Sequence, residues 1–357
     1  MIIKNGLVFS EDGTFTNKDL YIENGIISNE TTDSTVVDAT DLYVIPGLVD
    51  IHSHGACGFD FSDANSLGLS KILEYQRENG ITSYCPTTMS LPVDALKKIL
   101  TTACNVKDDT LAGVNLEGPF LDAVKKGAHD EKYIIPPDIS IFEQLKEVYG
   151  NIKLITIAPN IAGADNFISA LKDDVTISLG HTSTDYNTAK EALQNGARHI
   201  THLFNAMTYS HRNSGLIGAA ADNTDTTVEL ISDGVHTDES TVRTTFKLFR
   251  GRVALISDSM RATGLSDGEY DLGGQAVTVH GNLATLKDGT IAGSVTNLYN
   301  CMKTAVSFGV PLEDAIIAAT ATPAKVIGIY DKVGSLTAGK VANVLLVDKQ
   351  LNLIKVI

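Results

Sequence analysis

The sequence is short of positive charge. It has 28 Lys and Arg residues against 43 Asp and Glu residues in a chain of 357, which gives a formal net charge of −15. Proteins that bind nucleic acid or an anionic membrane surface need a basic face, so this deficit argues against both kinds of partner. It leaves room for a small anionic substrate, because one local Arg and a few backbone amides are enough to hold one.

Cysteines and long apolar stretches are also scarce. The four cysteines, Cys57, Cys85, Cys104 and Cys301, are scattered and form no Cys-x-x-Cys pair. This favours reduced thiols in a cytoplasmic protein over a disulfide framework. No apolar stretch reaches 18 residues, and no apolar signal run follows a basic segment at the N-terminus. We therefore expect neither a transmembrane helix nor a secretory signal.

The composition is that of a folded chain. Hydrophobic residues make up 43% and charged residues 20%, which is too apolar for a disordered protein. The length suggests two domains, or one large barrel with an attachment. A chain of this size can bury a large core without disulfides.

Both ends of the chain have the pattern of short strands. Residues 2–9, 19–23 and 26–28 are rich in β-formers and are separated by Asn-Gly and Asp-Gly turns, and residues 339–357 have the same texture. Neither end can bury a sheet face alone. We therefore expect residues 1–45 and 330–357 to form one small β-sandwich domain together.

Residues 46–329 alternate between short β-rich runs and amphipathic helical stretches such as LSKILEYQREN and VDALKKILTTA. Such alternation implies parallel strands with right-handed crossovers, and eight repeats predict a (β/α)8 TIM-like barrel of the α/β class. The alternative, an open doubly wound sheet, is expected to carry a G-x-G-x-x-G loop after its first strand, and that loop is absent. The eight predicted strands are 48–54, 81–87, 111–118, 153–159, 175–182, 199–205, 227–234 and 252–259.

Several of these strands end in groups that bind metals or move protons. In a barrel the carboxyl ends of all strands meet at one mouth, where active sites lie. The residues concerned are His52, His54, Glu117, His181, His202, Asp233, His236 and Asp258. His199 lies three residues before His202, so on a strand it faces the other way, and we interpret it as structural.

The residue types at this mouth favour a divalent metal. His52 and His54 are two apart on a strand and so project from one face. Imidazoles suit Zn, Fe and other first-row metals, and a carboxylate adds an oxygen ligand. A cation would relieve the crowding of buried charges, lower the pKa of a bound water and polarise a carbonyl. Asp258 would then accept the water proton and pass it to a leaving nitrogen.

Six motifs carry a family resemblance: PGLVDIHSHG (46–55), LEGPF (116–120), GHTS (180–183), THLFNAM (201–207), SDGVH (232–236) and SDSMRATG (257–264). They resemble the amidohydrolase superfamily and, more narrowly, its N-acetylglucosamine-6-phosphate deacetylase family. The resemblance covers nearly the whole chain, through ATPAKVIG (321–328) and GSLTAGKVANVLLVD (334–348). LEGPF with VKKGAH and THLFNAM is the most specific part.

The resemblance implies roles for the metal-binding and catalytic residues. Glu117, His181 and His202 match the main metal ligands, and Asp258 matches the catalytic acid/base. His52 and His54 match the pair that supports a second metal in some members, with Glu117 bridging the two ions. One or two divalent ions, Zn or Fe, are therefore expected in each subunit.

The resemblance also implies a substrate and its contacts. The reaction would hydrolyse the acetamido group of N-acetyl-D-glucosamine 6-phosphate to glucosamine 6-phosphate and acetate, in a cytoplasmic homodimer of amino-sugar catabolism. Arg212 would bind the phosphate, and in family dimers it would reach the phosphate in the neighbouring subunit's site. Asn205 and Ala206 would contact the phosphate through their backbones. The other residues expected to bind substrate are Ala128, His129, Asp233, His236, Ile291, Ala292 and Gly293.

Some alternatives stay open at this stage. Segments 293–300 and 211–215 depart from the usual family pattern and bear on which amino sugar fits. One alternative is an N-acetylgalactosamine-6-phosphate deacetylase. Another is a different amidohydrolase, such as a cyclic-amide hydrolase or a deaminase. A catalytically inactive relative that serves as an assembly protein is a further class. That class predicts broken ligands or a missing aspartate, and all of them are present.

Overall fold

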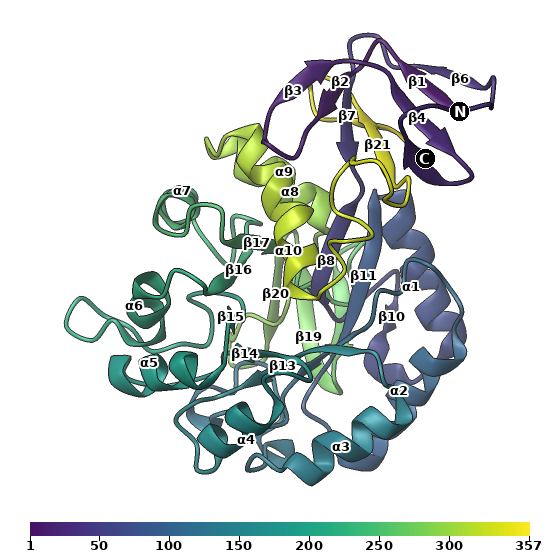
Figure 1. Cartoon of the computed structure of the whole chain (residues 1–357). Coiled ribbons are helices and arrows are strands. Elements are labelled where there is room, and N and C mark those ends of the chain that lie inside the picture. Colours follow the sequence, from purple (N-terminus) through teal and green to yellow (C-terminus); the bar gives the residue numbers. More distant parts are fainter.

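A parallel eight-stranded sheet forms the centre of the computed structural model, which describes residues 1–357 (Figure 1). All eight predicted strands are present and follow one another in chain order across the sheet. The sixth, predicted over 199–205, is shorter than expected and ends at Ile200, because the backbone turns left-handed at His202 and Phe204. They are β8 (Leu48–Ser53), β11 (Ile81–Thr88), β12 (Val114–Glu117), β13 (Ile152–Ile157), β14 (Thr176–Leu179), β15 (His199–Ile200), β16 (Thr227–Ile231) and β17 (Val253–Ile256).

The first and last strands of this sheet meet, which closes it into a TIM-like barrel. The hydroxyl of Ser257 donates to Oδ2 of Asp50 over 2.6 Å, and the backbone N–H of Asp258 donates to the carbonyl of His52 over 2.9 Å. Closure brings the residue after β17 next to the end of β8. The predicted fold class is therefore confirmed.

Helices surround the barrel, and Figure 1 shows α1 to α7 in chain order around its outside. The main core lies between helices and strands, as one cluster of 56 buried apolar residues. Asp138, Asp185 and Asp238 begin α3, α5 and α7 by accepting backbone N–H groups of the first turn. The helices are α1 (Ser66–Glu78), α2 (Val93–Asn105), α3 (Ile139–Val148), α4 (Ala164–Leu171), α5 (Tyr186–Asn195), α6 (Gly215–Asp222), α7 (Glu239–Leu248), α8 (Leu298–Ser307), α9 (Leu312–Ala319) and α10 (Ala321–Val326). Three 3-10 helices are η1 (Phe61–Asp63), η2 (Ala123–Lys125) and η3 (Glu131–Tyr133).

Two sheets lie at the top of Figure 1, and the five-stranded one contains strands from both termini. One sheet has the order β22-β21-β7-β2-β3 and the other β5-β4-β1-β6, and 11 buried apolar residues form their core. The predicted strand 2–9 is interrupted at Asn5, whose φ of 64° turns the chain from one sheet into the other. The exact limits of a terminal domain stay a prediction. The strands are β1 (Ile2–Lys4), β2 (Leu7–Phe9), β3 (Phe15–Asn17), β4 (Leu20–Glu23), β5 (Ile26–Ser28), β6 (Val36–Asp38), β7 (Tyr43–Pro46), β21 (Val344–Val347) and β22 (Leu353–Val356).

Two small antiparallel sheets were not predicted. A two-stranded sheet, β9 (Gly55–Ala56) and β10 (Phe59–Asp60), follows the first barrel strand, and a three-stranded sheet follows the last. The latter comprises β18 (Gly268–Leu272), β19 (Gln275–His280) and β20 (Leu283–Leu286). Leu272, the last residue of β18, and Ile291, which follows β20, line the cavity of the candidate site described below.

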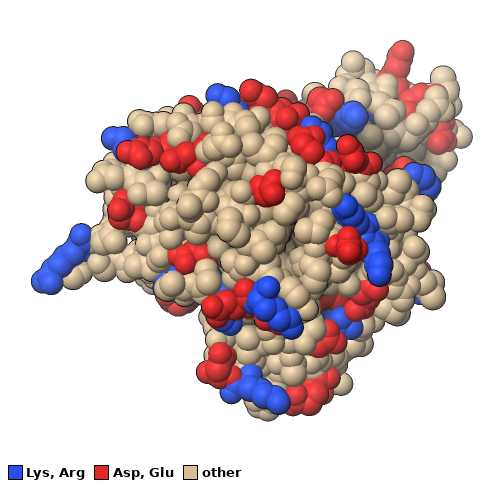
Figure 2. All heavy atoms as spheres, turned by 90° about the horizontal axis from the view of Figure 1, so that it is seen from below, with Lys and Arg blue, Asp and Glu red and all other residues tan.

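The surface carries charged side chains of both signs. Figure 2 shows a face on which Lys and Arg side chains are interspersed with Asp and Glu, so no broad patch of one sign covers it. None of the ten α-helices has the length and hydropathy needed to cross a bilayer.

Candidate metal centre and active site

The carboxyl ends of the barrel strands surround a cavity of about 290 Å³. All but four of the predicted site residues line it. The lining residues are His54, Met89, Glu117, Gly127, Ala128, His129, His181, His202, Asn205, Ala206, His236, Asp258, Leu272, Thr290, Ile291 and Gly293. The four exceptions are His52, Arg212, Asp233 and Ala292.

The carboxylate of Glu117, at the end of β12, lies at the centre of a ring of imidazoles. His181 and His202 place their Nε2 atoms 3.0 Å from its Oε1, and His52 places its Nε2 3.4 Å from the same oxygen. His54 approaches the other oxygen, Oε2, to 3.3 Å. The side chains of this group are almost completely buried. The structure thus brings together the residues predicted to bind metal.

Hydrogen bonds behind three of these rings fix which nitrogen carries the proton. In each ring Nδ1 faces an oxygen that can only accept, so Nδ1 holds the hydrogen, and in a neutral ring Nε2 presents a lone pair to Glu117. The acceptors are Oε2 of Glu229 for His52 (2.9 Å), the carbonyl of Thr87 for His54 (3.2 Å) and the carbonyl of Lys125 for His181 (2.9 Å). Such second contacts are typical of histidines that ligate metals.

His129 also contacts Glu117, but in the opposite tautomer. The backbone N–H of Ser90 donates to Nδ1 of His129 over 3.0 Å, so the ring proton resides on Nε2, 3.2 Å from Oε2 of Glu117. Burial lowers the pKa of His129 and the negative charge of Glu117 raises it; burial outweighs the charge and brings the pKa to about 4. His129 is therefore a neutral hydrogen-bond donor to Glu117 and has no lone pair left for a cation.

The remaining nitrogens fit a divalent cation. The Nε2 atoms of His181 and His202 lie 2.9 Å apart beside the same carboxylate oxygen. Nε2 of His52, which faces Glu117, is buried without a hydrogen-bond partner, although buried polar atoms are almost always paired. Imidazole nitrogens around a carboxylate are a donor set that Zn and Fe accept.

Asp258 lies on the other side of the ring. Its Oδ1 is 3.2 Å from Nε2 of His54 and 3.6 Å from Nε2 of His52. Burial raises the pKa of Asp258, but these two rings outweigh it and bring the pKa below the usual range. For His54 burial lowers the pKa, while Asp258 and Glu117 together raise it to about 10. The carboxylates therefore hold positive charge at this place, as a proton or as a metal.

The backbone is left-handed where several site residues leave their strands. The φ angles are 46° at His181, 25° at His202, 52° at Ala206 and 48° at Asp258. Residues with a Cβ adopt this region at a cost of about 1–3 kcal/mol each, and such residues cluster at functional sites. Here the turns direct the side chains of three strand ends into one cavity.

The predicted substrate residues divide into two groups. Those that line the cavity are Ala128, His129, Asn205, Ala206, His236, Ile291 and Gly293. Ala292, Asp233 and Arg212 do not line it, and Ala292 is fully buried. The backbone N–H of Asn205 already donates to the carbonyl of His202 over 3.0 Å.

Asp233 contacts the cavity only through His236. Its Oδ2 lies 2.7 Å from Nδ1 of His236, and its Oδ1 accepts the backbone N–H of the same residue over 2.8 Å. Burial lowers the pKa of His236, but the bond and the charge of Asp233 outweigh it and raise the pKa. The free nitrogen of His236 is thus Nε2.

Arg212 is not part of the cavity of its own chain. It lies in the exposed loop 209–214 between β15 and α6. No Lys or Arg lines the cavity at all. A phosphate bound there would find no cationic side chain of these two types among the lining residues.

The sequence analysis missed five residues of the site. Met89, Gly127, Leu272 and Thr290 line the cavity, and none of them has a side chain that ligates metals or moves protons; Gly127 lies within the motif VKKGAH, and the other three lie outside the motifs. Glu229 is fully buried beneath the histidines. Its signal was present in TVELI, where a charged residue interrupts an otherwise apolar strand.

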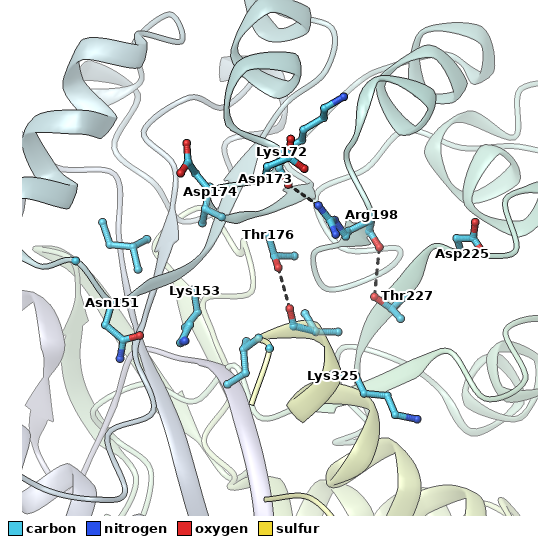
Figure 3. A pocket seen from close by; sticks show the side chains of 16 residues that line it. Asn151, Lys153, Lys172, Asp173, Asp174, Thr176, Arg198, Asp225, Thr227 and Lys325 are labelled. Carbon is cyan, nitrogen blue, oxygen red and sulfur yellow. Dashed lines mark hydrogen bonds between the residues drawn. The ribbon is translucent and has the colours of Figure 1, made fainter. Parts of the chain in front are cut away.

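A second cavity, of about 520 Å³, lies at the opposite end of the barrel, where β13, β14 and β16 begin (Figure 3). The contacts drawn there satisfy main-chain carbonyls: Thr176 donates to Val326 over 2.8 Å, and Arg198 donates to Lys172. No buried titratable side chain lines this cavity. It is larger than the first cavity but has no comparable chemistry.

Comparisons with known proteins agree with this geometry. The model of the amidohydrolase family matches residues 43–357. The N-acetylglucosamine-6-phosphate deacetylase of Bacillus subtilis (strain 168) is 35% identical, over 99% of this chain and 94% of its own length. The deacetylase of that name from Caenorhabditis elegans is 33% identical, over 95% and 88%.

Solved structures give the same result. The N-acetylglucosamine-6-phosphate deacetylase of Pasteurella multocida superposes with a TM-score of 0.94 at 26% identity, over 100% of this chain and 97% of its own. A variant of the Mycobacterium smegmatis deacetylase in complex with N-acetyl-D-glucosamine-6-phosphate has a TM-score of 0.93 at 29% identity, with the same coverage.

Proposed function

The chain belongs to the amidohydrolase family and, within it, to the N-acetylglucosamine-6-phosphate deacetylases, and we propose on this basis how its site performs that reaction. The enzyme hydrolyses the acetamido group of N-acetyl-D-glucosamine 6-phosphate, which yields glucosamine 6-phosphate and acetate. The observation that carries the assignment is the ring of imidazoles around Glu117 with Asp258 beside it, at the bottom of one cavity.

The enzyme depends on a divalent metal, and we propose that Glu117, His181 and His202 hold it. His52 and His54 are proposed to bind a second ion together with Glu117. Zn and Fe are the metals that this nitrogen-rich donor set favours. When bound, such a cation activates water and polarises the amide carbonyl. Nε2 of three of the rings is directed at Glu117 by the bonds at Nδ1.

Asp258 is proposed to move the proton of the reaction. Because its pKa lies below the usual range, Asp258 is ionised at neutral pH. The carboxylate can therefore accept the proton of the attacking water. The proton then goes to the nitrogen of the departing amine as the C–N bond breaks, so the carboxylate is regenerated at the end of the cycle. Nε2 of His54 lies 3.2 Å from the accepting oxygen Oδ1.

We propose that the cavity walls hold the sugar. His236 faces it with Nε2 because Asp233 occupies Nδ1. Its raised pKa favours a protonated ring that donates to a substrate oxygen. Ala128, His129, Ile291, Ala292 and Gly293 would shape the sugar site. Of the two backbone groups proposed for the phosphate, the N–H of Ala206 has no partner within the chain, in contrast to that of Asn205.

A homodimer is proposed because no Lys or Arg of the same chain lines the cavity to bind the phosphate. Arg212, on the exposed loop 209–214, would reach the cavity of the partner protomer, where its guanidinium can bind phosphate in a bidentate manner. Tyr209 on the same loop is 53% exposed, which supports burial against a second copy. A cytoplasmic location is proposed because all four cysteines are free thiols.

A turnover assay tests the function. Purified protein is offered N-acetylglucosamine 6-phosphate, N-acetylgalactosamine 6-phosphate and unphosphorylated N-acetylglucosamine, and the released acetate is measured. We expect the highest kcat/KM for the first compound. A preference for the second would assign the galactosamine epimer instead, and no acetate from any of them would contradict the proposal.

A further inference from the structure

Glu229 is a buried carboxylate that no step of the proposed mechanism uses. It lies in the middle of β16 and is 0% exposed. Its neighbours Val228 and Leu230 belong to the core between strands and helices, so the alternation of the strand directs Glu229 into the barrel, beneath the metal centre. A buried charge needs compensating donors, and the donors around Glu229 show what it does.

Three hydrogen bonds connect this carboxylate to the histidines of the site. Oε2 lies 2.9 Å from Nδ1 of His52 and accepts the backbone N–H of His202 over 3.0 Å. Oε1 lies 3.2 Å from Nε2 of His199, whose Nδ1 is 2.6 Å from the hydroxyl of Thr227. One side chain therefore contacts the ring of one proposed ligand and the main chain of another.

Each contact has a consequence for metal binding. The bond to Nδ1 of His52 keeps the proton away from Nε2, which is the nitrogen that faces Glu117. The bond to the N–H of His202 holds the chain at a residue with a φ of 25°, a conformation that costs energy and must be maintained by its surroundings. His199 donates from Nε2 to Oε1 of Glu229 and so helps to compensate the buried negative charge of this carboxylate.

We propose that Glu229 is a positioning residue that makes His52 a metal ligand and holds His202 in its ligating conformation, with His199 as its supporting partner. The inference rests on the proposed metal-dependent function and deepens it: the ion next to His52 and His54 depends on a carboxylate that does not touch it. Contacts of this kind change metal affinity by about 10–100-fold.

Cobalt binding tests this inference without substrate. Metal-free wild-type protein, Glu229→Gln and Glu229→Met are titrated with Co²⁺, and the bound equivalents and the visible absorption bands of the complex are recorded. Gln removes the charge but keeps an acceptor, so one equivalent should bind about 10–100-fold more weakly. Met removes charge and acceptor, so that equivalent should be lost and its bands should disappear.

Asp50→Asn is the matched control. Asp50 is another fully buried barrel carboxylate, but it contacts His52 only through the backbone N–H and bonds mainly to Ser257. This variant should lose stability and keep the wild-type affinity for Co²⁺. Should the Met variant fail to fold, the Gln variant decides alone.

Two results would overturn the inference: wild-type affinity and bands in both Glu229 variants, or the same loss of affinity in Asp50→Asn. Failure of the proposed function is recognised separately, because it would appear as wild-type protein that binds Co²⁺ normally and releases no acetate.

Discussion

Nε2 of His129 donates a hydrogen bond to Oε2 of Glu117 over 3.2 Å, whereas the other rings around this carboxylate approach it as potential ligands. The difference is set by the main chain, since the N–H of Ser90 occupies Nδ1 of His129 while a carbonyl occupies Nδ1 of His181. Two histidines at similar distances from one carboxylate therefore have different tasks.

This difference predicts that replacing His181 lowers the metal content and that replacing His129 does not. His181→Gln should lose most of the bound metal, because it removes a lone pair from the centre. His129→Gln should retain metal, because the amide can still donate to Glu117, and activity should fall only through altered substrate binding. Elemental analysis of both purified variants measures this. Equal metal loss in the two variants would contradict the tautomer assignment.

Asp258 should be essential for turnover and dispensable for metal retention at the main site. Asp258→Asn removes the proton acceptor, so kcat should fall by at least about 10²–10⁴-fold, while the metal held by Glu117, His181 and His202 stays bound. Steady-state kinetics and metal analysis on one preparation test both points. Normal turnover in this variant would remove Asp258 from the mechanism.

Arg212 should affect phosphorylated substrates selectively. Arg212→Ala should raise KM for N-acetylglucosamine 6-phosphate more than for the unphosphorylated sugar, because only the former has an anion to bind. Arg250→Ala, which removes another exposed Arg, is the control and should leave both KM values unchanged. Equal effects of Arg212→Ala on the two sugars would place this residue outside the phosphate site.

The Asp233–His236 pair predicts a pH dependence. Asp233 raises the pKa of His236, so the protonated, donating form persists to higher pH than in an isolated histidine. As the pH rises through this raised pKa, the donor is lost and kcat/KM should fall. In Asp233→Asn the fall should begin at lower pH. An unchanged alkaline limb in the kcat/KM profile of this variant would show that His236 does not donate to the substrate.

The sequence was informative where chemistry and periodicity coincided. Because parallel strands deliver their carboxyl ends to one mouth, locating His52, Glu117, His181 and Asp258 at strand ends was enough to predict that they meet. The eight strands themselves followed from alternation with amphipathic helices. The family resemblance added the specific substrate, which the residues of the metal centre could not specify.

Other features depend on three-dimensional context that no local pattern contains. The tautomer of His129 depends on the backbone N–H of Ser90, 39 residues away. The left-handed turns at His181 and Asp258 are disfavoured for these residue types and are imposed by the surrounding structure. Leu272 reaches the cavity only because the unpredicted sheet β18–β20 follows the last barrel strand.

The central claim is that histidines around Glu117 hold a cation that the deacetylation requires. The most direct measurement compares acetate release from N-acetylglucosamine 6-phosphate by the purified enzyme, by the enzyme stripped with a chelator, and by the stripped enzyme reloaded with Zn²⁺ or Fe²⁺. We predict activity in the first, its loss in the second and its return in the third. Undiminished acetate release by protein shown to contain no metal would contradict the account.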